Sequence, residues 1–176
     1  MSDQNTFHRF ILLLAAAVFL VVGIISATLF REASYSQKNA RKFEDVLHRK
    51  ERLLKEEFRK LELLLINDES SGVPDWKSEE YQELASSEGI YVFYYDSVEL
   101  KYWSDHSVPV PDRWRSRLNR PFISWRNKDY VSVIHPLKEG RLVGLIEVKT
   151  HYPTQNEFLI NEFQRDFHLD PEVEID

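Results

Sequence analysis

The longest apolar stretch of the chain runs from Phe10 to Phe30 and contains no charged residue. At about 1.5 Å of rise per residue, a helix of this length spans roughly 31 Å, close to the roughly 30 Å hydrocarbon core of a bilayer. A cleaved signal peptide has an apolar core of only about 7–15 residues. The cleavage site of a signal peptide also needs small residues, and in Ile25-Ser26-Ala27 the large Ile25 occupies one of these positions. We therefore expect a retained transmembrane helix over residues 10–30, after a short tail at residues 1–9.

Residues 31–67 are rich in charge and contain no Gly or Pro, which predicts a long helical stalk. Apolar residues recur in this stretch at heptad-like spacings, with Lys50 as a polar interruption. Such a stripe either pairs with its copy in a homodimer or packs on the domain that follows. Its members are Phe43, Leu47, Leu54, Phe58, Leu61 and Leu65.

Residues 75–169 predict a domain of α+β class with a mostly antiparallel sheet of about five strands. Loop composition at 67–74 precedes a helix over 78–88, and runs of β-branched and aromatic residues then alternate with turn residues. A long helix that leads into such a sheet is typical of extracytoplasmic sensor modules of the PAS or Cache kind. We expect short helices over 112–118 and 154–166, an acidic tail over 170–176, and strands over 90–95, 100–103, 122–125, 130–135 and 141–150.

Charge and composition narrow the functional classes. The net charge of −6 argues against nucleic-acid binding, and the absence of Cys excludes disulfides and cysteine-based sites. Basic residues that follow the apolar stretch would keep the rest of the chain in the cytoplasm by the positive-inside rule, yet long exported domains cross largely regardless of charge. We expect a single-pass protein of the inner membrane whose bulk is periplasmic. The basic residues are Arg31, Lys38, Arg41, Lys42, Arg49 and Lys50.

Motifs for catalysis are missing from the sequence. It has no glycine-rich phosphate loop, no His-Glu-x-x-His and no Gly-x-Ser-x-Gly. The histidines lack local metal-ligand spacing, and Asp105-His106 beside Trp103 fits a solvated turn better than an acid–base pair. We therefore expect no enzyme activity, no cofactor and no metal, and we assign no catalytic or ligand-binding residue. The histidines are His8, His48, His106, His135, His151 and His168.

Aromatic side chains crowd the first predicted hairpin. Side chains alternate between the two faces of a strand, so some of these rings point into the core and others outward. Outward rings line a ligand groove, cover the stalk helix or pack across strands, and the sequence leaves these three alternatives open. The rings belong to Tyr91, Phe93, Tyr94, Tyr95, Tyr102 and Trp103.

Two stretches, IYVFYYDSVELKYWSDHSVPVP at residues 90–111 and LVGLIEVKTHYPTQNEFLINEFQ at residues 142–164, resemble the input regions of membrane sensor histidine kinases of the Bacteroidetes. The first carries a strand, Asp, Leu-x-x-Trp-Ser and Val-Pro, and the second carries Tyr-Pro-x-Gln-Asn-x-Phe/Tyr-Leu after a Gly-Leu strand. The resemblance covers roughly residues 7–169. The residues that match the second motif are Tyr152, Pro153, Gln155, Asn156, Phe158 and Leu159.

The resemblance implies a sensor module of a two-component system that binds an unknown ligand. The family continues into a second transmembrane helix, a dimerisation helix with the phosphoacceptor His, and an ATP-binding domain. None of these is present here, and His168-Leu169-Asp170-Pro171 is not a phosphoacceptor context. We therefore expect an input half that neither binds ATP nor phosphorylates itself. The alternative is a membrane-tethered structural or partner-binding envelope protein without a kinase.

Overall fold

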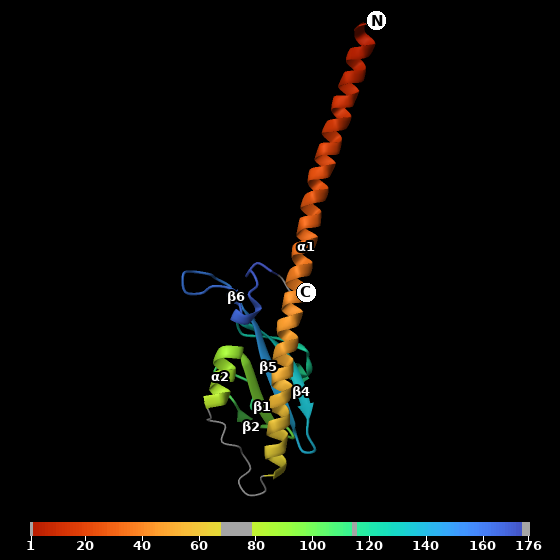
Figure 1. Cartoon of the computed structure of the whole chain (residues 1–176). Coiled ribbons are helices and arrows are strands. Elements are labelled where there is room, and N and C mark those ends of the chain that lie inside the picture. Colours follow the sequence, from red (N-terminus) through yellow and green to blue (C-terminus); the bar gives the residue numbers. More distant parts are fainter. Residues whose placement is uncertain (1, 68–78, 114–115, 174–176) are drawn as a thin grey trace. The chain divides into compact units, whose positions relative to one another are not determined.

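The computed structural model describes residues 2–67, 79–113 and 116–173 (Figure 1). Its contacts divide the chain into two compact units, Met1–Lys42 and Phe43–Asp176. Helix α1, Ser2–Asn67, begins in the first unit and ends in the second.

The first unit is helical from Ser2 to Lys42. The large apolar side chains described between Val18 and Ile25 are each more than half exposed. Among the side chains that the structure describes, no helix is both long enough and apolar enough to cross a membrane. Side chains 10–17 and 27–30 of the predicted span lie outside that set. The predicted transmembrane helix therefore stays a prediction.

In the second unit, the last turns of α1 lie across one face of the sheet (Figure 1). Leu54, Phe58 and Leu61 are at most 1% exposed, and Leu47 and Leu65 pack at the edges of the same cluster. The predicted stripe is thus buried on one face, as expected, and it packs on its own domain. The residues of the sheet on which the stripe packs are Ile90, Val92, Leu142 and Ile146.

Gly144 lets α1 approach the sheet closely. A methyl group added at Gly144 would overlap the side chain of Leu54. Because Leu54 is fully buried, it has little room to move away. The absence of a side chain at position 144 is therefore what allows Leu54 to sit directly on the central strand.

The sheet has the order β2-β1-β5-β4-β3, with every neighbouring pair antiparallel and β6 paired to β5. This confirms the predicted α+β class with a mostly antiparallel sheet, and the domain is compatible with a PAS-like fold. The elements are α2 (Glu79–Glu88), β1 (Ile90–Asp96), β2 (Glu99–Trp103), β3 (Phe122–Trp125), β4 (Lys128–Pro136), β5 (Arg141–Thr150) and β6 (Glu162–Phe163). Two 3-10 helices complete the unit, η1 (Ser116–Asn119) and η2 (Arg165–Phe167).

The second face of the sheet carries most of the aromatic side chains. Tyr91, Phe93 and Tyr95 project from β1 to this face, where Val108 and Leu118 cover them. Tyr94 and Tyr102 pack instead with the cluster under α1, and Trp103 is 40% exposed at the edge. Most of the rings of this hairpin therefore belong to the hydrophobic core, and Trp103 is the ring that points outward.

The predicted helix over residues 154–166 is wrong. This segment forms a loop, then strand β6 and helix η2. The Asn156 side chain accepts hydrogen bonds from the backbone N–H groups of Phe158 and Leu159, both at 2.8 Å, and so closes a turn instead of a helix. Near the other expected short helix, η1 begins at Ser116, and residues 114–115 lie outside the described set. The same holds for residues 68–78, which include the predicted loop and Ser78.

Candidate functional site

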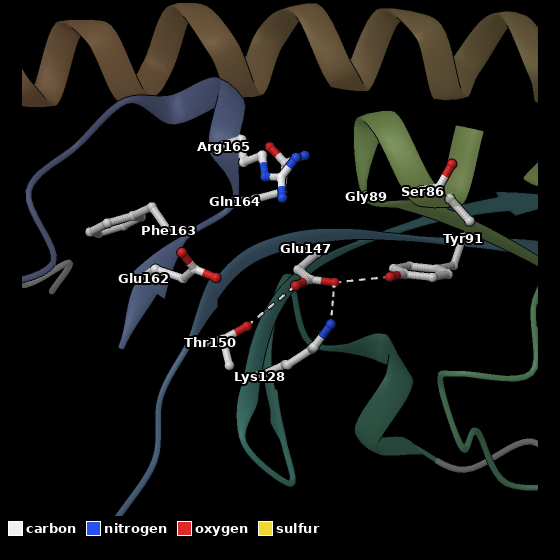
Figure 2. A pocket seen from close by; sticks show the side chains of 11 residues that line it. Ser86, Gly89, Tyr91, Lys128, Glu147, Thr150, Glu162, Phe163, Gln164 and Arg165 are labelled. Carbon is white, nitrogen blue, oxygen red and sulfur yellow. Dashed lines mark hydrogen bonds and ion pairs between the residues drawn. The ribbon is translucent and has the colours of Figure 1, made fainter. Parts of the chain in front are cut away.

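A pocket of about 300 Å³ opens where α2 meets the start of β1 and the end of β5 (Figure 2). Its volume is at the lower limit of the 300–1,000 Å³ that is usual for small-molecule sites. Polar side chains dominate its lining, in contrast to the apolar clusters on either side. Glu147 of β5 stands at its centre, with Tyr91 of β1 and Lys128 of β4 beside it.

Glu147 is a buried carboxylate with two firm partners on one oxygen. Its Oε2 accepts a hydrogen bond from the Tyr91 hydroxyl at 2.9 Å and from the Lys128 ammonium at 2.8 Å. Its Oε1 is met at 3.4 Å by the Thr150 hydroxyl, a long contact. The residue as a whole is 9% exposed. The Lys128–Glu147 pair thus cancels its own charge and leaves Oε1 as the oxygen that a ligand can engage.

The two tyrosines beside Glu147 are held in the protonated form. Burial, and then the negative charge of Glu147, raises the pKa of Tyr91 well above its usual range. The same two causes raise the pKa of Tyr130, whose ring meets that of Tyr91 edge-on with 6.2 Å between centroids. Tyr91 is therefore a hydrogen-bond donor at any physiological pH. That one proton goes to Glu147, so the Tyr91 oxygen is left to accept a hydrogen bond from a ligand.

The rim of the pocket comes from the segment after α2 and from β6 with η2. Gly89 follows α2 with a positive φ of 62°, and a methyl group there would lie 3.1 Å from Gln164 Cγ and 3.2 Å from Glu147 Cβ. Gln164 donates from Nε2 to the carbonyl of Ser87 at 3.0 Å. The two rim segments are therefore tied to each other directly above Glu147.

The same two segments hold α1 through a cluster of four charges that we call the clamp: Arg49 and Lys50 of α1, Glu88 and Asp166. Lys50 is fully buried, and its Nζ lies 3.2 Å from Glu88 Oε2 and 2.9 Å from Asp166 Oδ2. Arg49 pairs with Glu88 at 3.0 Å and also contacts Asp166. Lys50 further donates to the carbonyl of Glu88. The rim of the pocket and the grip on α1 are therefore built from the same residues or their immediate neighbours.

Ionisation of the clamp follows from these contacts. Although burial works to raise the pKa of Asp166, hydrogen bonds from Lys50 and Arg49 lower it overall. The hydrogen bond to Glu88 raises the pKa of Arg49. Arg49 and Asp166 are thus both charged at neutral pH.

The histidines whose side chains the structure describes do not converge on one site, and His8 lies outside that set. Among the side chains that the structure describes, no group of three or more His, Cys, Asp or Glu is placed to hold a metal ion. His135 contacts Glu62 at 3.0 Å and His151 contacts Asp129 at 3.4 Å. Asp105 Oδ1 accepts from the backbone N–H of Ser107 at 2.6 Å, and His106 binds the Trp103 indole N–H instead of Asp105.

Sequence reasoning missed Glu147 and the role of Lys50. A Glu in an otherwise apolar strand, RLVGLIEVKT, was the available signal for the first. A Lys inside an apolar stripe was the signal for the second, and it was interpreted as an interruption. Comparison of the chain with models of protein families, with characterised proteins and with solved structures gives no match.

Proposed function

We propose that this chain is the membrane-anchored, extracytoplasmic input module of a two-component sensor histidine kinase. In this proposal it binds a small ligand in the Glu147 pocket, and the signal leaves through α1. The chain itself carries no catalytic step and needs no cofactor or metal. Ligand recognition rests on Glu147, Lys128 and Tyr91.

One observation carries the proposal: the segments that rim the pocket also grip α1. Gly89 and Gln164 line the pocket, and Glu88 and Asp166, their neighbours in sequence, bind Lys50. A ligand that shifts either rim segment must therefore change the contacts of a fully buried lysine on α1. A buried charge is strongly sensitive to the position of its partners, so a small movement has a large energetic effect.

The proposed membrane anchor is supported by the sequence of residues 10–30 and by the solvent exposure of the side chains that the structure describes there. Residues 10–30 carry no charge, and the described apolar side chains between Val18 and Ile25 are exposed. An exposed set of this kind needs an apolar partner, and a bilayer is the partner that the length of the stretch fits. The motifs at residues 90–111 and 142–164 favour an input region that lies outside the cytoplasm.

A fusion experiment tests the anchor and its orientation. Alkaline phosphatase joined after Asp176 is expected to be active in a bacterial host, whereas a fluorescent protein that folds only in the cytosol is expected to be dark in the same position. The reverse pattern would place the bulk of the chain in the cytoplasm and contradict the orientation.

A chimera tests the signalling role. The chain is joined to the second transmembrane helix and kinase core of a membrane sensor kinase, and transcription from its target promoter is measured. Lys50→Met is expected to change basal output several-fold because it breaks the clamp. Lys55→Met removes an exposed lysine of the same helix and is the matched control. Equal output from all three proteins at equal membrane abundance would contradict the proposal.

A homodimer belongs to the proposal, and in it the dimer contact lies outside the three most buried residues of the stripe. Leu54, Phe58 and Leu61 are already buried against the sheet of the same chain. A dimer contact through the second unit would therefore involve other surfaces, and crosslinking of Cys placed at exposed positions such as Arg52 or Arg59 tests it directly.

The second candidate function is a membrane-tethered envelope protein that binds a partner and has no kinase. The loop between β5 and β6 favours it, because Phe158 and Ile160 are 82% and 54% exposed at the tip of a turn that Asn156 fixes. The reading frame beyond Asp176 separates the two candidates. A second apolar span followed by a His-containing dimerisation helix supports the kinase input, and a stop codon supports the tether.

A further inference from the structure

A second hollow, of about 540 Å³, lies between α2 and the edge strand β2. Ser86 lines both this hollow and the Glu147 pocket, so α2 separates the two. Trp103, which is 40% exposed, borders the hollow together with the ring of Tyr102. We infer that this hollow is a binding site for a neutral saccharide, which stacks on Trp103.

The Trp103 side chain is fixed in place at the surface. Its Nε1–H donates to Nδ1 of His106 at 2.7 Å, and the two rings meet at 74° with centroids 5.3 Å apart. An indole N–H only donates, so Nδ1 of His106 is the acceptor of this bond. An exposed aromatic ring that is held by a hydrogen bond at its edge is a preorganised platform for a flat ligand.

The charge of the lining selects a neutral ligand. Lys101 and Asp105 are the charged groups that line the hollow, and their charges cancel. Each also has a partner in the protein: Lys101 Nζ binds Glu99 at 3.1 Å, and Asp105 Oδ1 accepts from Ser107 N at 2.6 Å. With one charge of each sign in the lining, and with the Lys101 charge already paired, the hollow offers no net charge to attract a charged ligand, whose desolvation would weaken binding.

The polar groups around the ring select a ligand that both donates and accepts hydrogen bonds. Gln82 and Ser86 face the hollow from α2, and an amide and a hydroxyl each supply both a donor and an acceptor. Hydroxyl groups match such a lining because each also does both. A pyranose combines a flat face of C–H groups with a rim of hydroxyls, and this combination fits an aromatic platform with an amide and hydroxyl border.

Ligand-observed NMR and calorimetry on the full chain test this site. The protein is kept in a detergent without a sugar head group and titrated with maltotriose, cellotriose, mannotriose and N-acetylchitotriose at millimolar concentration. Adenosine, choline and galacturonic acid serve as aromatic, cationic and anionic comparisons. At least one of the four neutral trisaccharides is expected to bind, to bind more tightly than the three comparisons, and to change Trp fluorescence.

Variants locate the binding. Trp103→Ala is expected to weaken the affinity at least tenfold, whereas Trp103→Phe keeps an aromatic face, retains most of the affinity and loses the fluorescence change. Phe122→Ala removes an aromatic ring that is 41% exposed on a different strand, β3, and should leave binding unchanged. Circular dichroism checks that each variant is folded. The inference is overturned by no binding of any neutral trisaccharide, by unchanged binding in folded Trp103→Ala, or by tighter binding of a comparison compound.

Discussion

The two faces of the sheet differ in what covers them. On one face, α1 packs the apolar stripe of Leu54, Phe58 and Leu61 onto the strands, and Tyr81 of α2 joins the same cluster. On the other face, loops and η1 cover a layer of aromatic rings that ends in the buried carboxylate of Glu147. The first face is closed and apolar, and the second opens into a polar pocket. In the proposed function, α1 supplies stability and output, and the second face supplies recognition.

The clamp is where the two faces meet. Glu88 is the last residue of α2 and Asp166 lies in η2, so both belong to the segments that rim the pocket. Both also bind Lys50 of α1, the helix that covers the first face of the sheet. A buried lysine is costly unless its partners stay in place. In the proposed function, these shared residues couple the position of α1 to the state of the pocket.

The largest effect is expected from Leu61→Asp on the closed face. Leu61 is fully buried, so the variant places an unpaired carboxylate against apolar side chains and should lower the free energy of unfolding by about 4 kcal/mol. Leu63→Asp, at a position that is 60% exposed on the same helix, should change it by less than about 0.5 kcal/mol. Denaturant titration followed by circular dichroism measures both, and an equal effect of the two variants would show that the stripe is not a core.

Lys50→Met tests the clamp itself. The substitution keeps a long apolar stem but leaves Glu88 and Asp166 facing each other with Arg49 as their remaining cation. We expect a loss of about 3 kcal/mol in the free energy of unfolding, in the range measured when one member of a buried ion pair is removed. Lys55→Met should lose under about 1 kcal/mol, because that lysine is exposed and lies 3.8 Å from Glu51. Native-state hydrogen exchange should show faster exchange in α2 for Lys50→Met alone.

Gly144→Ala tests how closely α1 approaches the sheet. The added methyl group overlaps Leu54 and should destabilise the domain by about 2 kcal/mol through overpacking. The double variant Gly144→Ala/Leu54→Ala should lose less than the sum of the two single variants, since truncation of Leu54 makes room for the methyl group. Strict additivity in thermal melts would mean that residues 54 and 144 are not in contact.

Tyr91→Phe probes the open face with a smaller change. It removes the hydroxyl that donates to Glu147 at 2.9 Å and should cost about 1 kcal/mol of unfolding free energy, since Lys128 still satisfies the same oxygen. The fluorescence change expected for the saccharide site at Trp103 should persist in this variant. A loss of several kcal/mol would mean that the open face supports stability as much as the closed one does.

The smallest effect concerns acid pH. The pKa of Asp166 is lowered in the folded state, so its contribution to stability is present above the pKa of the unfolded chain, roughly 3.9, and is lost as pH falls through the lower folded value. Asp166→Asn should therefore be less stable than the wild type at pH 7 and should approach it below about pH 4. Asp45→Asn on the exposed side of α1 is the control. Parallel pH profiles for wild type and Asp166→Asn would contradict the role of Asp166.

The local sequence alone was sufficient to predict the hairpins and the buried face of α1. The runs Ile90–Tyr95 and Leu100–Trp103 flank a polar turn, and the spacing of Leu54, Phe58 and Leu61 follows the helical period, so each pattern depends on neighbours in sequence. The α+β class followed from these elements. The choice between a dimer seam and packing on the same chain did not, because one apolar stripe satisfies either partner.

Only the tertiary structure decided the rest. The helix expected over residues 154–166 failed for two reasons. The Asn156 side chain accepts hydrogen bonds from the backbone N–H groups of Phe158 and Leu159, and β5 offers an edge for β6, a contact between distant residues. Glu147 and Lys50 have ordinary neighbours in sequence, and their importance comes from partners 56 and 116 residues away, Tyr91 and Asp166. Desolvation and pairing of a charge depend on which distant segments surround it, and a periodic pattern of apolar residues does not encode that.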